Sequence, residues 1–218
     1  MPALRLAHRG DWRHAPENSL AALQAALANP SCDGLEIDVR TSADGVPVLL
    51  HDETLARVQR RPERVDELAA AELAALAIPT LTEVLDIIDP RAFLDVEFKA
   101  PHTTAALDAL RVGRGDPVRT VVSSFYPEIV ASLSHARVPW PIWLNSHTLS
   151  PGVIETAKDL GCCGVSANWR AIDSRTAAAV LGAELTLAAW PVRRRDTFRR
   201  LERLGVSAMC VEGAALDG

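Results

Sequence analysis

The sequence predicts an α/β protein with a compact (β/α)8 TIM barrel and a short excursion after its second strand. Two observations lead to this fold class. Apolar segments typical of short buried strands alternate with segments of helical periodicity, and strands are expected at 4–7, 34–39, 93–98, 120–123, 141–144, 163–166, 185–189 and 208–211. The polar residues that stand out fall at or near the carboxyl ends of these strands, where such barrels carry active sites. An open doubly wound sheet is the second choice of fold.

The composition excludes several classes of protein. The chain has 218 residues, of which 48% are hydrophobic and 23% charged, so we expect one globular domain over 1–218. A net charge of −5 argues against nucleic acid as a partner, because a protein that binds a phosphate backbone normally has a basic face. No segment approaches the ~18 apolar residues of a membrane span, and the N-terminus lacks the pattern of a signal peptide. We therefore expect a cytoplasmic protein that binds no membrane, while the pattern carries no information on oligomeric state.

The chain begins with a strand at 4–7 and a turn that leads to Asn18. Asn18 is placed to cap a helix over 19–28, whose leucines recur at helical spacing. The central strand at 34–39 then turns through an Asp-Gly pair into a strand at 46–50. Because Asp-Gly is a strong hairpin signal, we expect these two strands to be antiparallel neighbours.

The polar, alanine-rich segment 53–79 is the excursion, with one short helix near 66–76. Thr80 begins a capping box ahead of a helix at 84–88, so the barrel resumes there. Three later helices end in a Leu-Gly pair just before a strand, which predicts glycine C-caps, at Leu160-Gly161, Leu181-Gly182 and Leu204-Gly205.

Two acids stand in the apolar strand at 34–39. Glu36 and Asp38 are two residues apart, so their side chains point to the same side of the strand. A buried acid needs a cationic partner, and a pair of carboxylates suits Mg²⁺ or Ca²⁺. Glu97 is a third acid in an apolar strand, with Lys99 on the same side. We therefore expect one divalent cation, Mg²⁺ or Ca²⁺, at the acid pair.

Several short motifs follow one another along the chain: His8-Arg9-Gly10, Pro16-Glu17-Asn18-Ser19, Glu36-Ile37-Asp38-Val39, Asp44-Gly45 through His51-Asp52, and Glu97-Phe98-Lys99. Together they resemble the glycerophosphodiester phosphodiesterase family, within the PLC-like phosphodiesterase superfamily. The match is dense over 4–57, returns at 78–85 and 93–99, and is looser afterwards. Five motifs in the order found in the family identify it far more specifically than any one motif does.

The resemblance implies a TIM barrel that uses a divalent cation to hydrolyse small-molecule glycerophosphodiesters to sn-glycerol 3-phosphate and an alcohol. Position by position, it implies metal ligands at Glu36, Asp38 and Glu97, an acid and a base at His8 and His51, and phosphate contacts at Arg9 and Lys99. The chemistry agrees, because a phosphodiester transition state gathers negative charge that a metal and fixed cations stabilise. Histidines titrate in the range useful for both proton transfers.

Two points of the mechanism stay open at this stage. Either His8 or His51 could be the acid. Water could attack the phosphorus directly, or a neighbouring hydroxyl of the substrate could attack first and give a cyclic phosphate. Both routes belong to metal-assisted acid/base catalysis.

The chain departs from the family in the segment at Trp190, at the end of strand eight, and in the excursion after His51, which is shorter than the family's usual inserted region. The usual Trp-Thr-Val-Asn is Trp190-Pro191-Val192-Arg193, and the usual Asp at the end of strand eight is Glu212. Trp190 is the candidate for a wall of the substrate pocket. Arg193-Arg194-Arg195 is expected to be a solvated charge run, although it could reach an anionic substrate. These departures put the identity of the substrate's alcohol group in doubt.

Other polar and aromatic residues have plainer expected roles. Asp52 holds a turn, and Asn18 caps its helix rather than binding a ligand. Trp143 and Trp169 lie near strand ends, either in the core or at the pocket. The remaining histidines have no motif around them and are expected at the surface, at His14, His102, His135 and His147.

Two other functions are kept as alternatives. A noncatalytic phosphate-binding barrel would be expected to lack a metal ligand or a proton carrier, and the motifs lack none. A cyclising phospholipase or a sphingomyelinase D-like lipase would act at a membrane, and the sequence has no amphipathic anchoring helix.

Overall fold

Strand β1 (Leu4–His8) pairs in parallel with β2 (Gly34–Thr41) on one side and with β9 (Ala208–Val211) on the other, which closes a barrel. The computed structural model describes residues 2–13, 15–114 and 117–218. Between β2 and β9 the parallel neighbours are β4 (Phe93–Phe98), β5 (Thr120–Ser124), β6 (Ile142–Ser146), β7 (Gly164–Asn168) and β8 (Thr186–Val192). The predicted (β/α)8 barrel is confirmed, and the open sheet is wrong.

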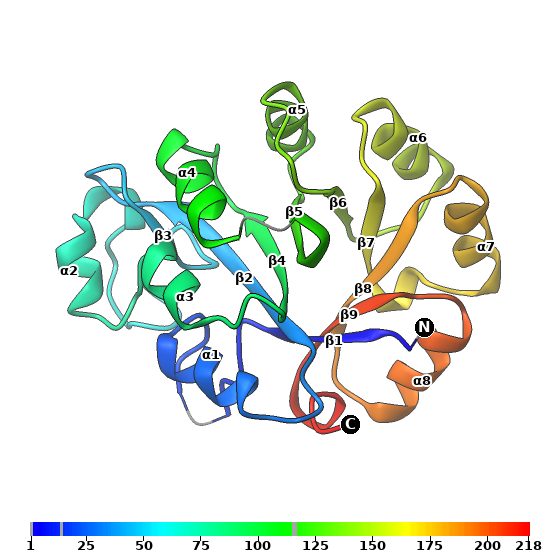
Figure 1. Ribbon diagram of the computed structural model, residues 1–218, viewed down its shortest axis with the longest axis horizontal. Helices are drawn as coiled ribbons and strands as arrows, with labels where there is room; N and C mark the ends of the chain where they lie inside the picture. The colour runs from blue at the N-terminus through cyan, green and yellow to red at the C-terminus, as the bar shows by residue number, and fades with distance from the viewer. Residues whose placement is uncertain (1, 14, 115–116) are drawn as a thin grey trace.

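The helices lie outside the ring of strands, as Figure 1 shows. Along the chain they are α1 (Leu20–Leu27), α3 (Leu81–Ile87), α4 (Thr104–Gly113), α5 (Pro127–His135), α6 (Pro151–Asp159), α7 (Ser174–Gly182) and α8 (Arg195–Arg203). Short 3-10 turns lie at η2 (Pro117–Arg119), η3 (Trp169–Ala171) and η4 (Gly213–Ala215). The apolar faces of the helices pack on the outer faces of the strands in one core, in which Leu23 of α1 joins Leu35 and Ile37 of β2.

The excursion after β2 begins with β3 (Pro47–Leu49), which pairs antiparallel with β2. The turn between them contains Gly45 with a φ of 81°, as the Asp-Gly signal predicts. The chain then forms η1 (Val65–Glu67) and α2 (Ala70–Ala74). This segment encloses a small apolar cluster of its own, made of Val48, Leu50, Leu55, Val65, Leu73 and Ile78.

Most of the helix ends follow the predicted capping signals. Thr80 caps α3 in a capping box, and Gly161 and Gly205 take the left-handed conformation with φ of 72° and 87°. Gly182 is the last residue of α7, and Glu184 has the positive φ, 61°, in its place. The prediction for Gly182 is wrong because α7 continues through it before the chain reverses.

The alternation of side chains along β2 positions the site. Glu36, Asp38 and Arg40 share one face of the strand, and the apolar residues between them pack toward the helices. The three charged residues therefore face the interior of the barrel.

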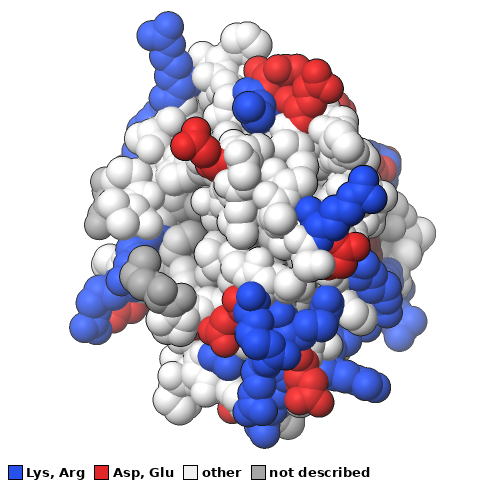
Figure 2. All heavy atoms as spheres, turned by 90° about the vertical axis from the view of Figure 1, so that its right-hand side faces the viewer, with Lys and Arg blue, Asp and Glu red and all other residues white. Residues whose placement is uncertain are grey.

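The surface carries no membrane-crossing element in the described ranges, since no helix there is both long and apolar enough for a span. Figure 2 shows Lys and Arg gathered at the lower end of the face that carries α7 and α8. On α8, Arg195, Arg199 and Arg203 are exposed. These arginines belong to the outer layer of the barrel and are free to be solvated.

Candidate active site

Three carboxylates meet at the carboxyl ends of β2 and β4. Asp38 is in register with Glu97 on the neighbouring strand, and Glu36 lies one inward-facing position earlier. One carboxylate oxygen from each lies within 4.8 Å of the other two. All three side chains are buried. The structure thus brings the predicted metal ligands together at the spacing that one hard cation needs.

Two cations lie against this carboxylate cluster. The Lys99 ammonium pairs with Glu97 and lies 3.3 Å from Oδ1 of Asp38. Nε of Arg9 lies 3.0 Å from Oδ2 of Asp38. Burial favours the neutral acid, but Arg9 and Lys99 outweigh it and hold the pKa of Asp38 below its usual range.

Glu36 forms no such ion pair with Arg9 or Lys99, and among the described residues only one basic nitrogen, Nε2 of His8 at 3.7 Å, approaches its carboxylate. Glu36 is buried, with 3% of its surface exposed, and neither of its carboxylate oxygens accepts a hydrogen bond from a described residue. Burial and the negative charges of Asp38 and Glu97 raise the pKa of Glu36 well above 4.5. Burial and Asp38 also raise the pKa of Glu97 to about 8. A buried carboxylate without donors is costly in water-free surroundings, and a bound cation would remove that cost.

The turn after β1 is held in a strained conformation that serves the cluster. Arg9 and Asn18 both have left-handed φ, 60° and 58°. The Arg9 N–H donates to the carbonyl of Glu36, and Nδ2 of Asn18 donates to Oδ2 of Asp38 at 2.8 Å. The prediction that Asn18 caps a helix is wrong, because Ser19 caps α1 and the Asn18 side chain is buried against Asp38.

His8, the last residue of β1, is oriented by Glu212, which follows β9. Nδ1 of His8 lies 2.6 Å from Oε1 of Glu212, and Nε of Arg193 donates to Oε2 of Glu212 at 2.6 Å. Burial lowers the pKa of His8, against the hydrogen bond to Glu212 that raises it. Two residues that depart from the family pattern, Arg193 and Glu212, are therefore joined by a hydrogen bond.

His51 is oriented in the same way from the opposite side. Its Nδ1 lies 2.6 Å from Oδ1 of Asp52, and Arg57 donates to Oδ2 of Asp52 at 2.6 Å. The His51 carbonyl accepts a hydrogen bond from Nε of Arg40 at 3.0 Å. Burial lowers the pKa of His51, and Asp52 acts against that shift. Asp52 therefore orients a ring in addition to holding its turn.

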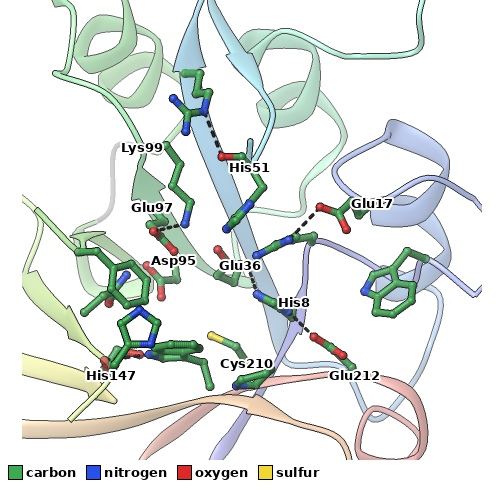
Figure 3. Close-up of a pocket in the computed structure, with 18 of the residues that line it drawn as sticks. His8, Glu17, Glu36, His51, Asp95, Glu97, Lys99, His147, Cys210 and Glu212 are labelled. Atoms are coloured by element: carbon green, nitrogen blue, oxygen red, sulfur yellow. Dashed lines mark hydrogen bonds and ion pairs between the residues drawn. The ribbon is translucent and has the colours of Figure 1, made fainter. Parts of the chain in front are cut away.

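The two imidazoles leave the same nitrogen for chemistry. Figure 3 shows His8 and His51 extending toward Glu36 from opposite sides of the pocket. Nε2 of His8 lies 3.7 Å from Oε2 of Glu36. Because a carboxylate occupies Nδ1 in each ring, Nε2 is the atom that can exchange a proton in the pocket.

Trp190 lines the same cavity, which has a volume of about 770 Å³, and forms an aromatic wall with Phe125 and His147. The ring centroid of Trp190 lies 4.9 Å from that of Phe125 and 5.1 Å from that of His147. Nε1 of Trp190 donates to the carbonyl of Ser166 at 3.0 Å. His147 is exposed, as predicted for a surface residue, but nothing in its sequence context indicated that it lines the pocket.

A buried polar chain beside the carboxylates was missed from the sequence. Oγ of Ser123 donates to Asp95 at 2.7 Å, and Nδ2 of Asn145 donates to Oγ of Ser123 at 3.2 Å. Burial raises the pKa of Asp95 to about 7. Asp95 stands two residues before Glu97, so strand alternation could have placed it on the inner face. Asn145 had no signal, because its contact with Ser123 depends on the pairing of β6 with β5.

The other singled-out residues lie away from the site. Trp143 is buried in the core, and Trp169 is packed outside the pocket. His135 is exposed as predicted, whereas His102 is half-buried. The prediction for His14 lies outside the described residues.

The model of the glycerophosphoryl diester phosphodiesterase family matches residues 8–214. The chain belongs to this family. The matched range extends from His8 past Glu212, so it covers the whole arrangement of the pocket. The resemblance seen in the sequence motifs is confirmed.

Curated members of the glycerophosphoryl diester phosphodiesterase family align with part of the chain. A glycerophosphodiester phosphodiesterase from Caldanaerobacter subterraneus is 35% identical over 114 residues, which cover 46% of this chain and 46% of the relative. Glycerophosphodiester phosphodiesterase 1 from Bos taurus is 33% identical over 170 residues, covering 66% of this chain and 50% of the relative. The chain thus spans about half the length of the curated relatives it matches.

Solved structures share the barrel over nearly the whole chain. An Oleispira antarctica phosphodiesterase in complex with the product sn-glycerol-3-phosphate has a TM-score of 0.85 at 24% identity, covering 96% of this chain and 93% of that chain. A glycerophosphodiester phosphodiesterase from Thermotoga maritima has a TM-score of 0.81 at 20% identity, covering 100% and 96%. These likenesses show the fold that the family adopts.

Proposed function

We propose that this chain is a metal-dependent glycerophosphodiester phosphodiesterase, which hydrolyses glycerophosphodiesters to sn-glycerol 3-phosphate and an alcohol. The observation that carries the proposal is the buried carboxylate of Glu36, whose oxygens accept no hydrogen bond among the described residues although Asp38 and Glu97 lie beside it. Membership of the family and curated relatives named glycerophosphodiester phosphodiesterase support the same activity.

Glu36, Asp38 and Glu97 would hold the divalent cation, Mg²⁺ or Ca²⁺. Their ligand atoms lie within 4.8 Å of one another, and both cations prefer hard carboxylate oxygens. When bound, the cation would supply positive charge to the nonbridging oxygens of the phosphodiester. It would also balance the burial and repulsion that raise the pKa of Glu36.

Arg9 and Lys99 are the proposed phosphate contacts. Both line the pocket, and each is fixed by carboxylates, Arg9 by Asp38 and Glu17 and Lys99 by Asp38 and Glu97. Cations held in this way need no reorganisation when negative charge develops on the phosphate oxygens in the transition state. Each has further N–H donors to offer the substrate.

His8 and His51 are the proposed acid and base. Glu212 and Asp52 each occupy an Nδ1 atom, so the two Nε2 atoms exchange protons with the substrate. One Nε2 takes the proton from the attacking oxygen, and the other gives a proton to the leaving alkoxide. The attacking oxygen belongs to water or to a neighbouring hydroxyl of the substrate, and the second route leaves a cyclic phosphate for a later hydrolysis.

Trp190, with Phe125 and His147, is the proposed wall against the organic part of the substrate. Aromatic faces pack on CH groups and keep water from the reacting centre. We further propose that residues 1–218 act as one domain. A cytoplasmic location and the absence of nucleic-acid and membrane partners stay predictions from the sequence.

The test is release of sn-glycerol 3-phosphate from glycerophosphoethanolamine and glycerophosphoserine by protein stripped with EDTA, before and after Mg²⁺, Ca²⁺ or Mn²⁺ is added. We expect turnover only with a cation, its loss in His51→Ala, and its retention in Arg61→Gln, whose guanidinium pairs only with Glu63 on the surface. Substrate binding without turnover under every cation would contradict the proposal and indicate a noncatalytic barrel. Cyclic phosphate as the end product would instead indicate a cyclising enzyme.

A further inference from the structure

Arg40 is a buried cation inside the proposed substrate pocket. It follows Asp38 by two residues on β2 and shares the inner face of that strand. The rise of about 3.3 Å per residue places its Cα roughly 7 Å nearer the barrel mouth than the Cα of Asp38. Arg40 lines the same cavity as the carboxylates, yet it is 8% exposed.

Arg40 forms no ion pair with the described residues, and the carboxylates of Glu53, Asp38 and Asp52 act on it only from a longer distance. Its guanidinium donates from Nε to the carbonyl of His51 at 3.0 Å, and no carboxylate oxygen of the described residues lies within 4.0 Å of it. The other Lys and Arg side chains that line the pocket each pair with a carboxylate, namely Arg9, Arg57, Lys99 and Arg193.

Burial makes this unpaired charge informative. The exposed arginines in the basic region of α8, on the face shown in Figure 2, need no anion because water solvates them. A guanidinium that is mostly removed from water costs free energy unless an anion or several acceptors replace the lost hydration. Arg40 makes one hydrogen bond to the described residues, through Nε, and neither of its Nη atoms is both buried and unpartnered. The Nη donors therefore reach the solvent of the pocket, where a ligand can accept hydrogen bonds from them.

We propose that Arg40 binds a second anionic group of the substrate, carried by the alcohol, so that the preferred substrates are glycerophosphodiesters with a carboxylate or an additional phosphate on the alcohol. The inference rests on the proposed function, because it takes the reacting phosphate to lie at Arg9, Lys99 and the carboxylate cluster. Arg40 is then the next cation toward the mouth.

The chemistry of the substrate decides which half reaches Arg40. The glycerol half carries only hydroxyl groups, so a second anion must belong to the alcohol half. Carboxylate and phosphate oxygens accept paired N–H donors from a guanidinium in good geometry. An alcohol that ends in an ammonium group, such as ethanolamine, is repelled at the same place.

The test compares kcat/KM for sn-glycero-3-phosphoserine and sn-glycero-3-phosphoinositol 4-phosphate with that for sn-glycero-3-phosphoethanolamine. Arg40→Gln removes the charge but keeps an N–H donor, and Arg40→Lys restores the charge. We expect Arg40→Gln to lower kcat/KM for the anionic substrates by about 10- to 100-fold and to leave the ethanolamine diester within about threefold. Arg40→Lys should recover part of the loss, and Arg61→Gln should change none of the values.

The outcomes separate this inference from simpler roles of Arg40. Loss on the serine diester alone identifies the carboxylate as the bound anion, and loss on the inositol phosphate diester alone identifies the phosphate. An equal loss on all three substrates would overturn the inference, because Arg40 would then act on the reacting phosphate or through the His51 carbonyl. Normal turnover of all three in Arg40→Gln would overturn it as well.

A binding measurement keeps the inference testable if no diester is hydrolysed. Calorimetric titration with O-phosphoserine and phosphoethanolamine, in the presence of Mg²⁺, probes the pocket without turnover. We expect tighter binding of O-phosphoserine to the natural protein and no difference in folded Arg40→Gln. If no diester is hydrolysed but O-phosphoserine still binds more tightly than phosphoethanolamine, the proposed activity is refuted and the role of Arg40 is not. If the natural protein binds both compounds equally, the role of Arg40 is refuted.

Discussion

Replacing Glu36 by Gln should stabilise the metal-free protein and abolish its activity. The side chain keeps its shape but loses a charge that is buried beside Asp38 and Glu97. Neither Glu36 oxygen accepts a hydrogen bond from a described residue, so the substitution sacrifices no donor seen there. We therefore expect the Glu36 carboxylate to lower the stability of the metal-free protein while being required for activity.

The size of the effect follows from the geometry. At a separation of 4.8 Å, the upper limit in this cluster, and an effective dielectric constant of about 20, two unit charges repel by about 3.5 kcal/mol. Arg9 and Lys99 offset part of the repulsion, so we expect Glu36→Gln to raise the metal-free free energy of unfolding by about 1 to 2 kcal/mol. For a chain of this length, that corresponds to a rise in Tm of about 2 to 8 °C.

The cation should stabilise the natural protein much more than Glu36→Gln. At 100 times its Kd, a ligand that binds only the folded state adds about 2.7 kcal/mol, or about 5 to 11 °C in Tm. The natural protein should gain this with Mg²⁺ or Ca²⁺. Glu36→Gln, which has lost a ligand, should gain little and hydrolyse no substrate.

Scanning calorimetry at pH 8 and pH 5, with EDTA or with the cation, measures both effects. Burial and like charges raise the folded-state pKa of Glu36 above the unfolded value of 4.5, so its ionisation destabilises the metal-free protein as pH rises above that value. The advantage of Glu36→Gln should therefore be larger at pH 8 than at pH 5.

Two control variants sharpen the result. Asp38→Asn should destabilise the protein by about 3 to 5 kcal/mol, because it leaves the buried Arg9 and Lys99 without their shared partner. Glu53→Gln, an exposed acid outside the cluster, should change little. The reasoning fails if metal-free Glu36→Gln is less stable than the natural protein, or if it keeps the full gain in Tm with the cation.

Three further predictions concern the surroundings of the cluster. The acid limb of the kcat/KM profile should lie below pH 6.5, because burial lowers the pKa of both His8 and His51, and either Asp52→Asn or Glu212→Gln should move that limb to lower pH by removing the carboxylate that raises the pKa of the base. Glu212→Gln should lower kcat at least about tenfold and remove the stability that is lost as pH falls from 4.5 toward 2, because the folded-state pKa of Glu212 is about 2. Gly34→Ala should lower Tm or block folding, since its Cβ would lie 2.0 Å from the carbonyl oxygen of Phe93. A pH titration of activity checks the first prediction, and an unchanged acid limb would contradict it. Measurements of kcat and of thermal unfolding across pH check Glu212→Gln, and an unchanged kcat would contradict that prediction. The Tm and the yield of folded protein check Gly34→Ala, and an unchanged Tm would contradict it.

Much of the barrel could be predicted from local patterns. The order of strands and helices, the hairpin at Gly45 and the capping box at Thr80 each depend on residues close together in the chain. Strand alternation alone put Glu36 and Asp38 on one face. The roles expected of these residues came from the resemblance to a family, which compares motifs rather than geometry.

The pairing of His8 with Glu212 shows where local reasoning ends. The two residues are 204 positions apart, and their 2.6 Å contact exists only because β9 returns to β1 and closes the barrel. The sequence marked Glu212 as a departure but contained no information on which histidine it would orient.

The sequence by itself determined which side chains share a face within each strand, because the period of a β-strand is set by local backbone geometry. The tertiary structure decided the contact of Asn18 with Asp38 and the hydrogen bonds that join Asp95, Ser123 and Asn145. It also decided that Arg40 meets a carbonyl oxygen, and no carboxylate, among the described residues. The physical reason is that register between strands, burial and the supply of counter-ions depend on packing across the closed barrel, and none of these is a property of a single segment.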